Sequence, residues 1–459
     1  MLEERLRSAV GLLMLIGLSW LLCRRAERRH IPWRAVGWGI LLQFVLAVGI
    51  LRLPWAGAFF RGCGDLVTGL LAHAQEGAKL PFGVLMDSGK LGQVFGPENA
   101  TIFAIQQLAP TIIFFSALTS VGYQLGVLQW LVGIVAKAVV RVMGTSGAET
   151  LSAAGNIFLG MVEAPLTIRP YLAALTRSEL FCVMVCGLSN LAGSVLAVYA
   201  GLLHDALPTA AGHLVTMSVM SMPAGLVIAK IMLPETGQPE TLGRVELVKE
   251  KPYANVIDAI TVGASDGLKV AAGVVAMLIA MVAIVSLCNG VLGAPARWHN
   301  QAIVAAAHAP EVKADDAAAV QAAADQAGLP AHAWHAPTLQ GTLGVAFRPL
   351  AWGLGVSRED IPKVGELLGV RTVLNEFLAY LQMGSELKAK PDAMTERSRI
   401  LTTYALCSFA NFGSVAILLG GVGVLAPSRR RELAELGIPS LVGGTLAAHM
   451  TACVVGMLI

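Results

Sequence analysis

The chain has 459 residues, of which 55% are hydrophobic and only 14% are charged, and its formal net charge is +3. A soluble domain carries charge on about a quarter of its residues, so this composition indicates a protein that lies mostly in a membrane. The small net charge gives no reason to expect nucleic acid as a partner.

Eight segments are apolar and long enough to cross a bilayer, which takes about 20 residues. They cover residues 8–23, 36–53, 100–122, 179–204, 210–233, 266–290, 399–425 and 438–459. The first is not expected to be a cleaved signal peptide, because arginines follow its apolar run rather than precede it. The seven cysteines show no metal-ligand spacing, so we expect them to be core residues. The sequence therefore predicts an all-α, polytopic membrane protein.

Basic residues gather in the loops that follow the first, fifth and seventh predicted spans. They are Arg24, Arg25, Arg28, Arg29 and Arg34, then Arg244, Lys249 and Lys251, then Arg429, Arg430 and Arg431. Eight spans place the three loops on one side, which the positive-inside rule makes cytoplasmic. We therefore expect a multi-pass protein of a bacterial-type inner membrane with both termini outside.

Two carboxylates, Glu163 and Glu376, lie in apolar segments that are too short or too broken to be ordinary spans. Each is followed by an apolar helix with the same internal pattern, at an offset of 220 residues. The paired patterns are Arg177-Ser178 with Gly193-Ser194-Val195, and Arg397-Ser398 with Gly413-Ser414-Val415. An ionisable group at membrane depth is by default a functional-site hypothesis. The structural alternative is a buried ion pair, for which Arg169 is the best candidate partner of Glu163.

The predicted spans make the two halves an inverted repeat. The first hairpin, about residues 145–173, enters and leaves on the cytoplasmic side, and the second hairpin, about residues 360–385, on the outer side. Two opposed re-entrant hairpins are tolerated only where protein or a wet cavity covers their backbone. The helices after both hairpins carry break signals: Gly187, Ser189, Asn190 and Gly193, and Ser408, Asn411, Gly413 and Ser414. A broken helix offers free backbone groups to polar ligands and ions.

The chain divides into five expected regions. Residues 1–123 supply mainly scaffold spans and an interfacial segment, 124–235 and 346–459 are the two halves of a transport domain, 236–291 is a linking scaffold span, and 292–345 is an outer loop insertion. The insertion holds His299, His308, His332 and His335, but no third metal ligand is evident nearby. Residues 83–91 lack the hydroxyl residue of a phosphate-binding loop, so ATP-driven transport has no support.

Several motifs are specific in combination. They are residues 108–118, Gly144 to Glu149, Glu163-Ala-Pro-Leu166 with Ile168-Arg-Pro-Tyr171, Gly263 to Lys269, Asn375-Glu376-Phe377 and Phe409-Ala410-Asn411. From about residue 33 to the C-terminus the chain resembles the concentrative nucleoside transporter family. The resemblance implies a homotrimer in the lipid bilayer, a scaffold and a moving transport domain in each protomer, and cation-coupled uptake of nucleosides. The insertion is longer than this family leads us to expect.

The resemblance assigns the ribose to Glu376, Asn411 and Ser414, with Phe409 as an aromatic wall and Glu163 as a further substrate residue. The chemistry fits, because a carboxylate accepts two hydroxyl hydrogen bonds and an asparagine both donates and accepts. Asn411 and Ser414 could instead be helix-packing residues. Beside a hairpin carboxylate we favour the binding site.

The first departure from the family concerns base recognition. The family usually places a glutamine and a hydroxyl residue directly before the carboxylate of the first hairpin, where they contact the nucleobase. Met161 and Val162 occupy these positions here. The expected base pocket has therefore lost an amide and a hydroxyl, and shape and contact area should dominate selectivity.

The second departure concerns the coupling ion. Asn156 matches the family's sodium-binding asparagine, Leu159 and Leu191 match two carbonyl donors, and Asn190 stands where a hydroxyl residue is usual. An amide oxygen can still ligate a hard cation, so sodium stays the preferred ion. A proton carried by Glu163 is the rival.

The sequence thus predicts a secondary active transporter that imports nucleosides, is not an enzyme, and uses no cofactor besides the coupling ion. An ion channel also suits opposed hairpins with facing carboxylates, and a transporter of a different small polar solute stays open. A membrane enzyme is disfavoured, because no nucleophile–base pair or metal cluster falls at membrane depth.

Overall fold

The computed structural model describes residues 2–95, 104–245 and 253–459. The described chain is helical, and its one β-type pairing is an isolated bridge between Ser146 and Leu242. Seven helical segments of this part are long and apolar enough to span a membrane: Leu2–Leu22 (α1), Trp33–Arg52 (α2), Ala104–Gln124 (η4 and α5), Arg177–Leu203 (α8 and α9), Ala210–Met232 (α10), Val256–Ala306 (α11) and Pro427–Leu458 (η8 and α18). The predicted all-α, multi-pass class is confirmed. Residues 100–103 of the third predicted span lie outside the described residues, as do Lys249 and Lys251.

The remaining helices complete the described fold. They are η1 (Arg28–His30), α3 (Pro54–Phe82), η2 (Gly83–Met86), α4 (Ser88–Phe95), α6 (Val127–Met143), α7 (Gly147–Gly155), η5 (Ala164–Tyr171), α12 (Ala317–Gln326), α13 (Leu339–Leu354), η6 (Arg358–Asp360), α14 (Ile361–Val373), α15 (Glu376–Ala389), η7 (Pro391–Ala393), α16 (Glu396–Leu406) and α17 (Phe412–Leu425). Within the long segments, η4 covers Ala104–Leu108, α5 Ala109–Gln124, α8 Arg177–Leu188, α9 Gly193–Leu203, η8 Pro427–Arg429 and α18 Arg430–Leu458.

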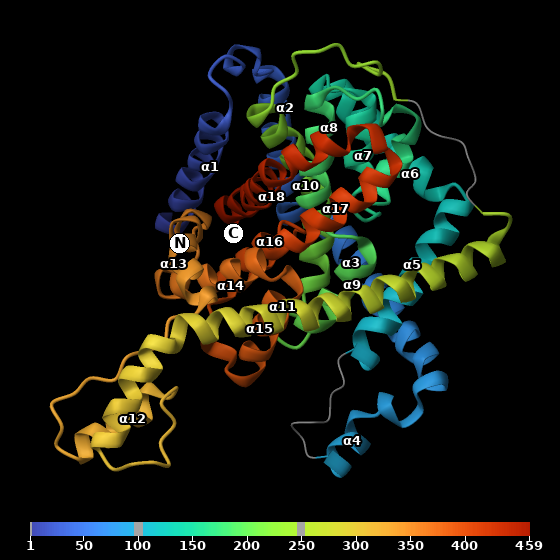
Figure 1. Cartoon of the computed structure of the whole chain (residues 1–459). Helices are drawn as coiled ribbons and strands as arrows, with labels where there is room; N and C mark the ends of the chain where they lie inside the picture. Colours follow the sequence, from blue (N-terminus) through green and yellow to red (C-terminus); the bar gives the residue numbers. More distant parts are fainter. Residues whose placement is uncertain (1, 96–103, 246–252) are drawn as a thin grey trace.

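The core lies around α10, which packs against α8 and α18. In the most apolar stretch of α10, 89% of the residues are buried, against 11% in α11. Figure 1 shows α11 running along the edge of the bundle, from α5 towards α12. A helix that is apolar yet this exposed requires lipid or another protein surface around it.

Two stretches of the chain share one order of elements. In the first, α7 packs against η5 and is followed by α8 and α9; in the second, α14 packs against α15 and is followed by α16 and α17. The segment expected to span the membrane over 399–425 is therefore two short helices. Residues 189–192 and 407–411 separate the paired helices, and the two breaks meet, because the Phe409 amide donates to the Asn190 carbonyl at 3.2 Å.

The helix that contains the sixth predicted span extends beyond the predicted end near residue 290. Helix α11 continues through Pro295 to Ala306, since a proline removes one backbone hydrogen bond without always ending a helix. The polar stretch after it is also more ordered than a solvated loop. Its helix α12 packs on the end of α11 through a small separate cluster of Ile303, Val304, Val320 and Ala324.

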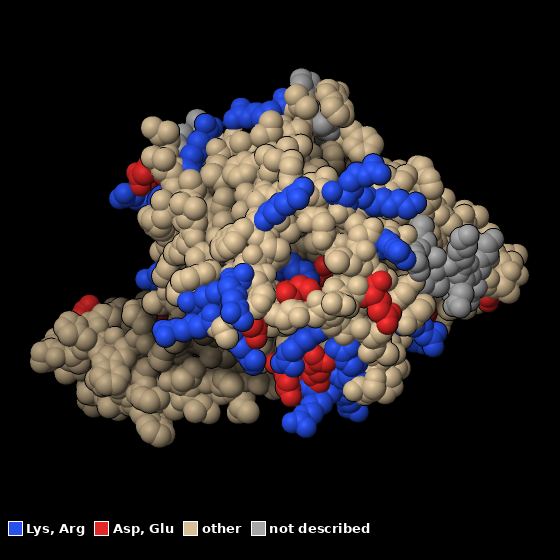
Figure 2. Space-filling view, turned by 90° about the horizontal axis from the view of Figure 1, so that it is seen from above, with Lys and Arg blue, Asp and Glu red and all other residues tan. Residues whose placement is uncertain are grey.

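The two ends of the bundle differ in their connections. At one end, Arg177 at the start of α8 pairs with Glu435 of α18 at 3.2 Å, and Thr176 donates to Glu235 beyond α10 at 2.7 Å. Figure 1 places the α1–α2 connection at this upper end as well, and Figure 2 shows lysine and arginine side chains around much of this face. At the other end the termini meet, where Arg5 donates to the Ile459 carbonyl at 2.8 Å.

Candidate functional site

A cavity of about 310 Å³ lies between the two repeated stretches and the helices α5 and α11. This volume falls at the lower end of the range typical of small-molecule sites. Six of the seven predicted substrate residues line it: Met161, Val162, Glu163, Glu376, Phe409 and Ser414. The seventh, Asn411, is fully buried and binds Glu376 from behind.

Four helices begin at this cavity. Helix η5 starts directly after Glu163, α9 at Gly193, α15 at Glu376 and α17 at Phe412. The free N–H groups and the dipole at a helix N-terminus favour negative charge. The fold thus brings partial positive charge to both predicted carboxylates and to polar groups of a ligand between them.

Glu376 is held on both of its carboxylate oxygens. Tyr199 of α9 donates to one oxygen at 2.8 Å, and the amide of Asn411 donates to the other at 2.8 Å. The other end of the Asn411 side chain accepts from the Ser414 amide at 2.8 Å and so caps α17. Asn375 caps α15 by accepting from the Leu378 amide, which makes Glu376 the first residue of that helix. These bonds fix the carboxylate, while its remaining lone pairs can accept from a ligand.

Sequence reasoning missed one partner of this carboxylate, Tyr199, and a buried arginine on the preceding helix. Tyr199 lies on an apolar helix 177 residues away from Glu376, and nothing in its context distinguishes it from a core aromatic residue. Arg371 is fully buried on α14, one helix before Glu376. A basic residue inside an apolar hairpin is a signal that could have identified Arg371 from the sequence.

Glu163 differs from the expectation of a buried carboxylate, because its side chain is exposed where it borders the cavity. The turn before it is tight: a Cβ atom at Gly160 would overlap the Glu163 carboxylate. Glu163 also borders a second, smaller cavity of about 130 Å³, together with Tyr253 and with Asp266 of α11. The two cavities share several lining residues and form adjoining spaces.

Met161 and Val162 have both a lining and a packing role. The Met161 backbone and Cβ lie against Gly187 of α8, where a further Cβ atom would come within 3.2 Å. The Val162 side chain fills the place that a Cβ atom would take at Gly421 of α17. The side chains therefore join the tip of the first hairpin to both broken helices and also border the cavity.

The predicted sodium residues lie where the first hairpin meets the break between α8 and α9. The Asn190 amide donates to the Asn156 carbonyl at 2.7 Å and to the Ser218 carbonyl at 3.4 Å. Its side-chain oxygen is buried and has no hydrogen-bond partner in the described part of the chain. A free amide oxygen beside backbone carbonyls suits a hard cation, so these residues fit sodium. Leu159 borders the smaller cavity, and Leu191 is buried within the break.

Membrane-length helices around a cavity, with two broken helices and two carboxylates at its wall, are typical of a membrane transport protein. Comparison with known proteins gives the family. Residues 10–85 and 213–456 match the N-terminal and C-terminal models of the Na+-dependent nucleoside transporters, and residues 105–206 match a nucleoside recognition model. The chain belongs to the concentrative, Na+-dependent nucleoside transporter family, which confirms the resemblance in its sequence.

Relatives align over nearly the whole chain. An uncharacterized transporter of Haemophilus influenzae is 37% identical over 99% of this chain and 98% of its own length. The rat sodium/nucleoside cotransporter 1 is 35% identical over 99% of this chain and 64% of its own length. The inward-facing, substrate-bound structure of CNTnw superposes with a TM-score of 0.82 at 34% identity and covers 98% of both chains. An outward-facing CNTnw variant superposes with a TM-score of 0.84, at 34% identity, and the match covers 99% of this chain and 97% of that chain.

Proposed function

We propose that this protein is a secondary active transporter that imports nucleosides across the inner membrane by coupling them to a cation. The observation that carries the proposal is the Glu376 carboxylate, held by Tyr199 and Asn411 at the wall of a cavity between two broken helices. A fixed carboxylate with free lone pairs suits a vicinal pair of hydroxyls, which is the chemistry of ribose. Ser414 and Phe409 complete this wall.

The residues that line the cavity support a division of the chain into a moving transport domain and a fixed scaffold. Residues 124–235 and 346–459, with both hairpins and both broken helices, form the transport domain, while residues 1–123 and 236–291 form the scaffold. Substrate sits between them, since Leu108, Val270 and Met277 of the scaffold face Glu376 and Glu163 across the cavity. Alternating access then needs movement of one body against the other around the site. The insertion, 292–345, takes no part in the cavity wall.

The membrane arrangement extends this proposal. The two hairpins are re-entrant and opposed, the basic end of the bundle faces the cytoplasm, and both termini face outward. The exposed apolar length of α11 is supporting evidence for a homotrimer, in which neighbouring copies cover part of that surface.

The test of the function is uptake of labelled nucleosides by proteoliposomes that contain the purified protein. A transporter accumulates substrate above its outside concentration, saturates, and loses accumulation when the ion gradient is collapsed. A channel, which opposed hairpins also suit, equilibrates the solute without accumulation. Absence of uptake across purine and pyrimidine nucleosides, with uptake of another polar solute, would contradict the nucleoside assignment.

We expect sodium to be the coupling ion. Replacement of sodium by choline at neutral pH should collapse accumulation, and Asn156→Ala should raise the sodium concentration needed for half-maximal uptake by about tenfold, the effect of one lost ligand bond of about 1.4 kcal/mol. Asn300→Ala is the matched control, because Asn300 is an equally buried asparagine whose amide binds carbonyls within the insertion. Uptake that follows a pH gradient and ignores sodium would instead make Glu163 the proton carrier.

We expect the base pocket to discriminate by shape. Met161 and Val162 offer an apolar wall, which separates similar ligands by only about 1–3 kcal/mol per group. Wild-type protein should therefore tolerate purines and separate uridine from cytidine weakly. The double variant Met161→Gln with Val162→Thr should sharpen preference among pyrimidines and shift apparent affinities by about tenfold, which corresponds to one net hydrogen bond.

A matched control for this pair is Leu166→Gln, a polar substitution on the same hairpin at an exposed side chain that lines neither cavity. Its competition profile across a nucleoside panel should equal that of the wild type. An unchanged profile in the double variant would show that Met161 and Val162 only pack the hairpin tip against Gly187 and Gly421.

A further inference from the structure

The largest fully buried side chain of the described structure is a charged one, Arg371. It lies near the end of α14, the first helix of the second hairpin. Burial of an unpaired guanidinium is strongly unfavourable. The hydrogen-bond partners of Arg371 therefore indicate which parts of the fold this side chain connects. Arg371 donates to three groups: the Ala405 carbonyl at 3.0 Å, the Ser408 hydroxyl at 2.9 Å and the Thr445 hydroxyl at 3.0 Å.

Two of these partners lie beside or within the break between α16 and α17. Ala405 lies in the last turn of α16, where carbonyls lack helical partners, and Ser408 lies inside the break. Asn411, three residues beyond Ser408, donates to Glu376. The guanidinium therefore ties α14 to the backbone segment that carries one of the two hydrogen-bond partners of the Glu376 carboxylate.

Arg371 and Glu376 lie five residues apart in the chain, at the end of α14 and the start of α15, and these two helices pack against each other, so the fold brings opposite charges near one another. The other titratable groups around this pair come from neighbouring elements: Tyr199 of α9, Tyr380 of α15, Cys407 in the break and His449 of α18. A planar guanidinium keeps its charge and directs several donors at once, so it can fix an orientation that a single ammonium group cannot.

We propose that Arg371 is a positioning residue for ribose recognition, which sets the relative placement of Glu376 and Asn411 by clamping the second hairpin to the break between α16 and α17. It acts through these residues and does not touch the substrate, because it is fully buried and does not line the cavity. The proposal rests on the proposed function, since it takes the hydroxyls of a nucleoside to be the groups that bind the Glu376 carboxylate, which Asn411 holds in place.

The experiment compares uptake of uridine with uptake of 2′-deoxyuridine and 3′-deoxyuridine. A site that binds a hydroxyl with placed polar groups rejects the analogue that lacks it. In Arg371→Gln, we expect the preference for uridine over the rejected analogue to fall about tenfold, as one net hydrogen bond to the ribose is lost. The KM for uridine should rise, while the KM for the analogue changes little. Arg371→Lys keeps the charge and should restore part of the preference.

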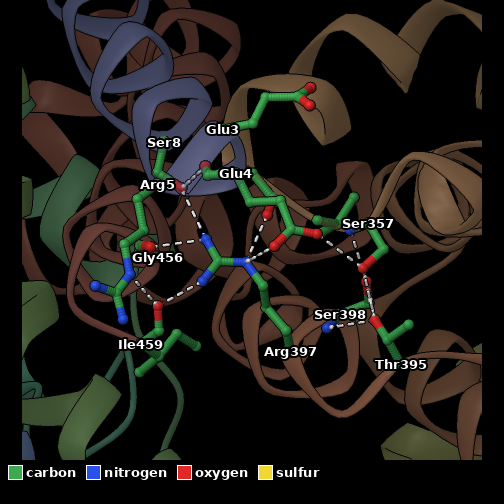
Figure 3. Close-up of polar contacts among 12 residues, drawn as sticks. Glu3, Glu4, Arg5, Ser8, Ser357, Thr395, Arg397, Ser398, Gly456 and Ile459 are labelled. Atoms are coloured by element: carbon green, nitrogen blue, oxygen red, sulfur yellow. Dashed lines mark hydrogen bonds and ion pairs between the residues drawn. The ribbon is translucent and has the colours of Figure 1, made fainter. Parts of the chain in front are cut away.

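Arg397→Gln is the matched control. Figure 3 shows that Arg397 also ties α16 to neighbouring elements through backbone carbonyls, at the end of the helix away from the break. It donates to Gly355 at 2.8 Å and to Gly456 and Ile459 at 2.7 Å each. Loss of a structural clamp should lower stability and protein yield in this variant without changing the ratio of uridine to deoxyuridine uptake.

The outcomes separate the proposal from the function on which it rests. Wild-type protein that transports no nucleoside contradicts the proposed function. Wild-type protein that prefers uridine, together with an Arg371→Gln variant of unchanged preference, overturns the positioning role alone. If Arg371 variants do not fold, Ser408→Ala removes the same contact from the side of the break while Arg371 keeps its charge. The preference for uridine over the deoxyuridine analogue should then fall in Ser408→Ala. An unchanged preference in this variant would also overturn the proposal.

Discussion

We expect Glu376→Gln to fold normally and to lose saturable nucleoside uptake, with a drop of at least about 100-fold. Glutamine has the shape of glutamate, so packing against Tyr199 and Asn411 is kept. The change removes the negative charge and one of the two acceptor oxygens. Hydrogen bonds to a charged group contribute about 1.5–3 kcal/mol each, and 2.8 kcal/mol corresponds to about 100-fold. The measurement is initial uptake of labelled nucleoside by proteoliposomes over a range of substrate concentrations.

Glu386→Gln provides the matched control on the same helix. Glu386 accepts from Lys363 at 2.5 Å, far from the cavity wall, and should keep wild-type uptake within about two-fold, because partly exposed ion pairs contribute little. Thermal unfolding of both variants shows whether the proteins are folded. Uptake by folded Glu376→Gln within two-fold of the wild type would disprove the ribose assignment.

The features that could be predicted from the sequence were residues that do not fit their apolar surroundings, either because they are charged or because they interrupt a helix. A carboxylate in an apolar segment, as at Glu163 and Glu376, conflicts with the surrounding hydrophobicity and so marks a functional site. Glycine, serine and asparagine within an apolar helix indicate a break, and the structure places breaks at 189–192 and 407–411. The recurrence of both signals at one spacing predicts two related halves of the chain.

Features that depend on tertiary packing could not be predicted in this way. Tyr199 becomes a partner of Glu376 only because α9 and α15 pack against each other. The continuation of α11 was also missed, since the predicted span ended with the apolar run near residue 290, while the helix continues to Ala306 and packs on α12. The exposure of Glu163 depends on the shape of a cavity formed by six separate segments.

A second large effect is expected at Lys230, whose role no sequence pattern indicated. Two capping boxes, Ser146 with Glu149 and Thr176 with Glu179, place two buried carboxylates at the starts of α7 and α8. Lys230 of α10 lies between these helix starts, 4% exposed, and pairs with Glu149 at 2.7 Å. The Ser146 hydroxyl donates to Glu179 and so joins the two boxes. The lysine thereby attaches the first hairpin to the core of the bundle.

Lys230→Met should therefore destabilise the protein by about 3–5 kcal/mol, because it leaves a buried carboxylate without its counter-charge. Denaturant unfolding of the purified protein in detergent measures the effect. Lys388→Met is the matched control: Lys388 pairs with Asp205 at 3.4 Å, but both side chains are largely exposed, so the change should cost at most about 1 kcal/mol. The double variant Lys230→Met with Glu149→Gln should recover part of the loss, since removal of both partners of a buried pair is less costly than removal of one. Equal stability of Lys230→Met and Lys388→Met would show that the first hairpin is held by its apolar contacts alone.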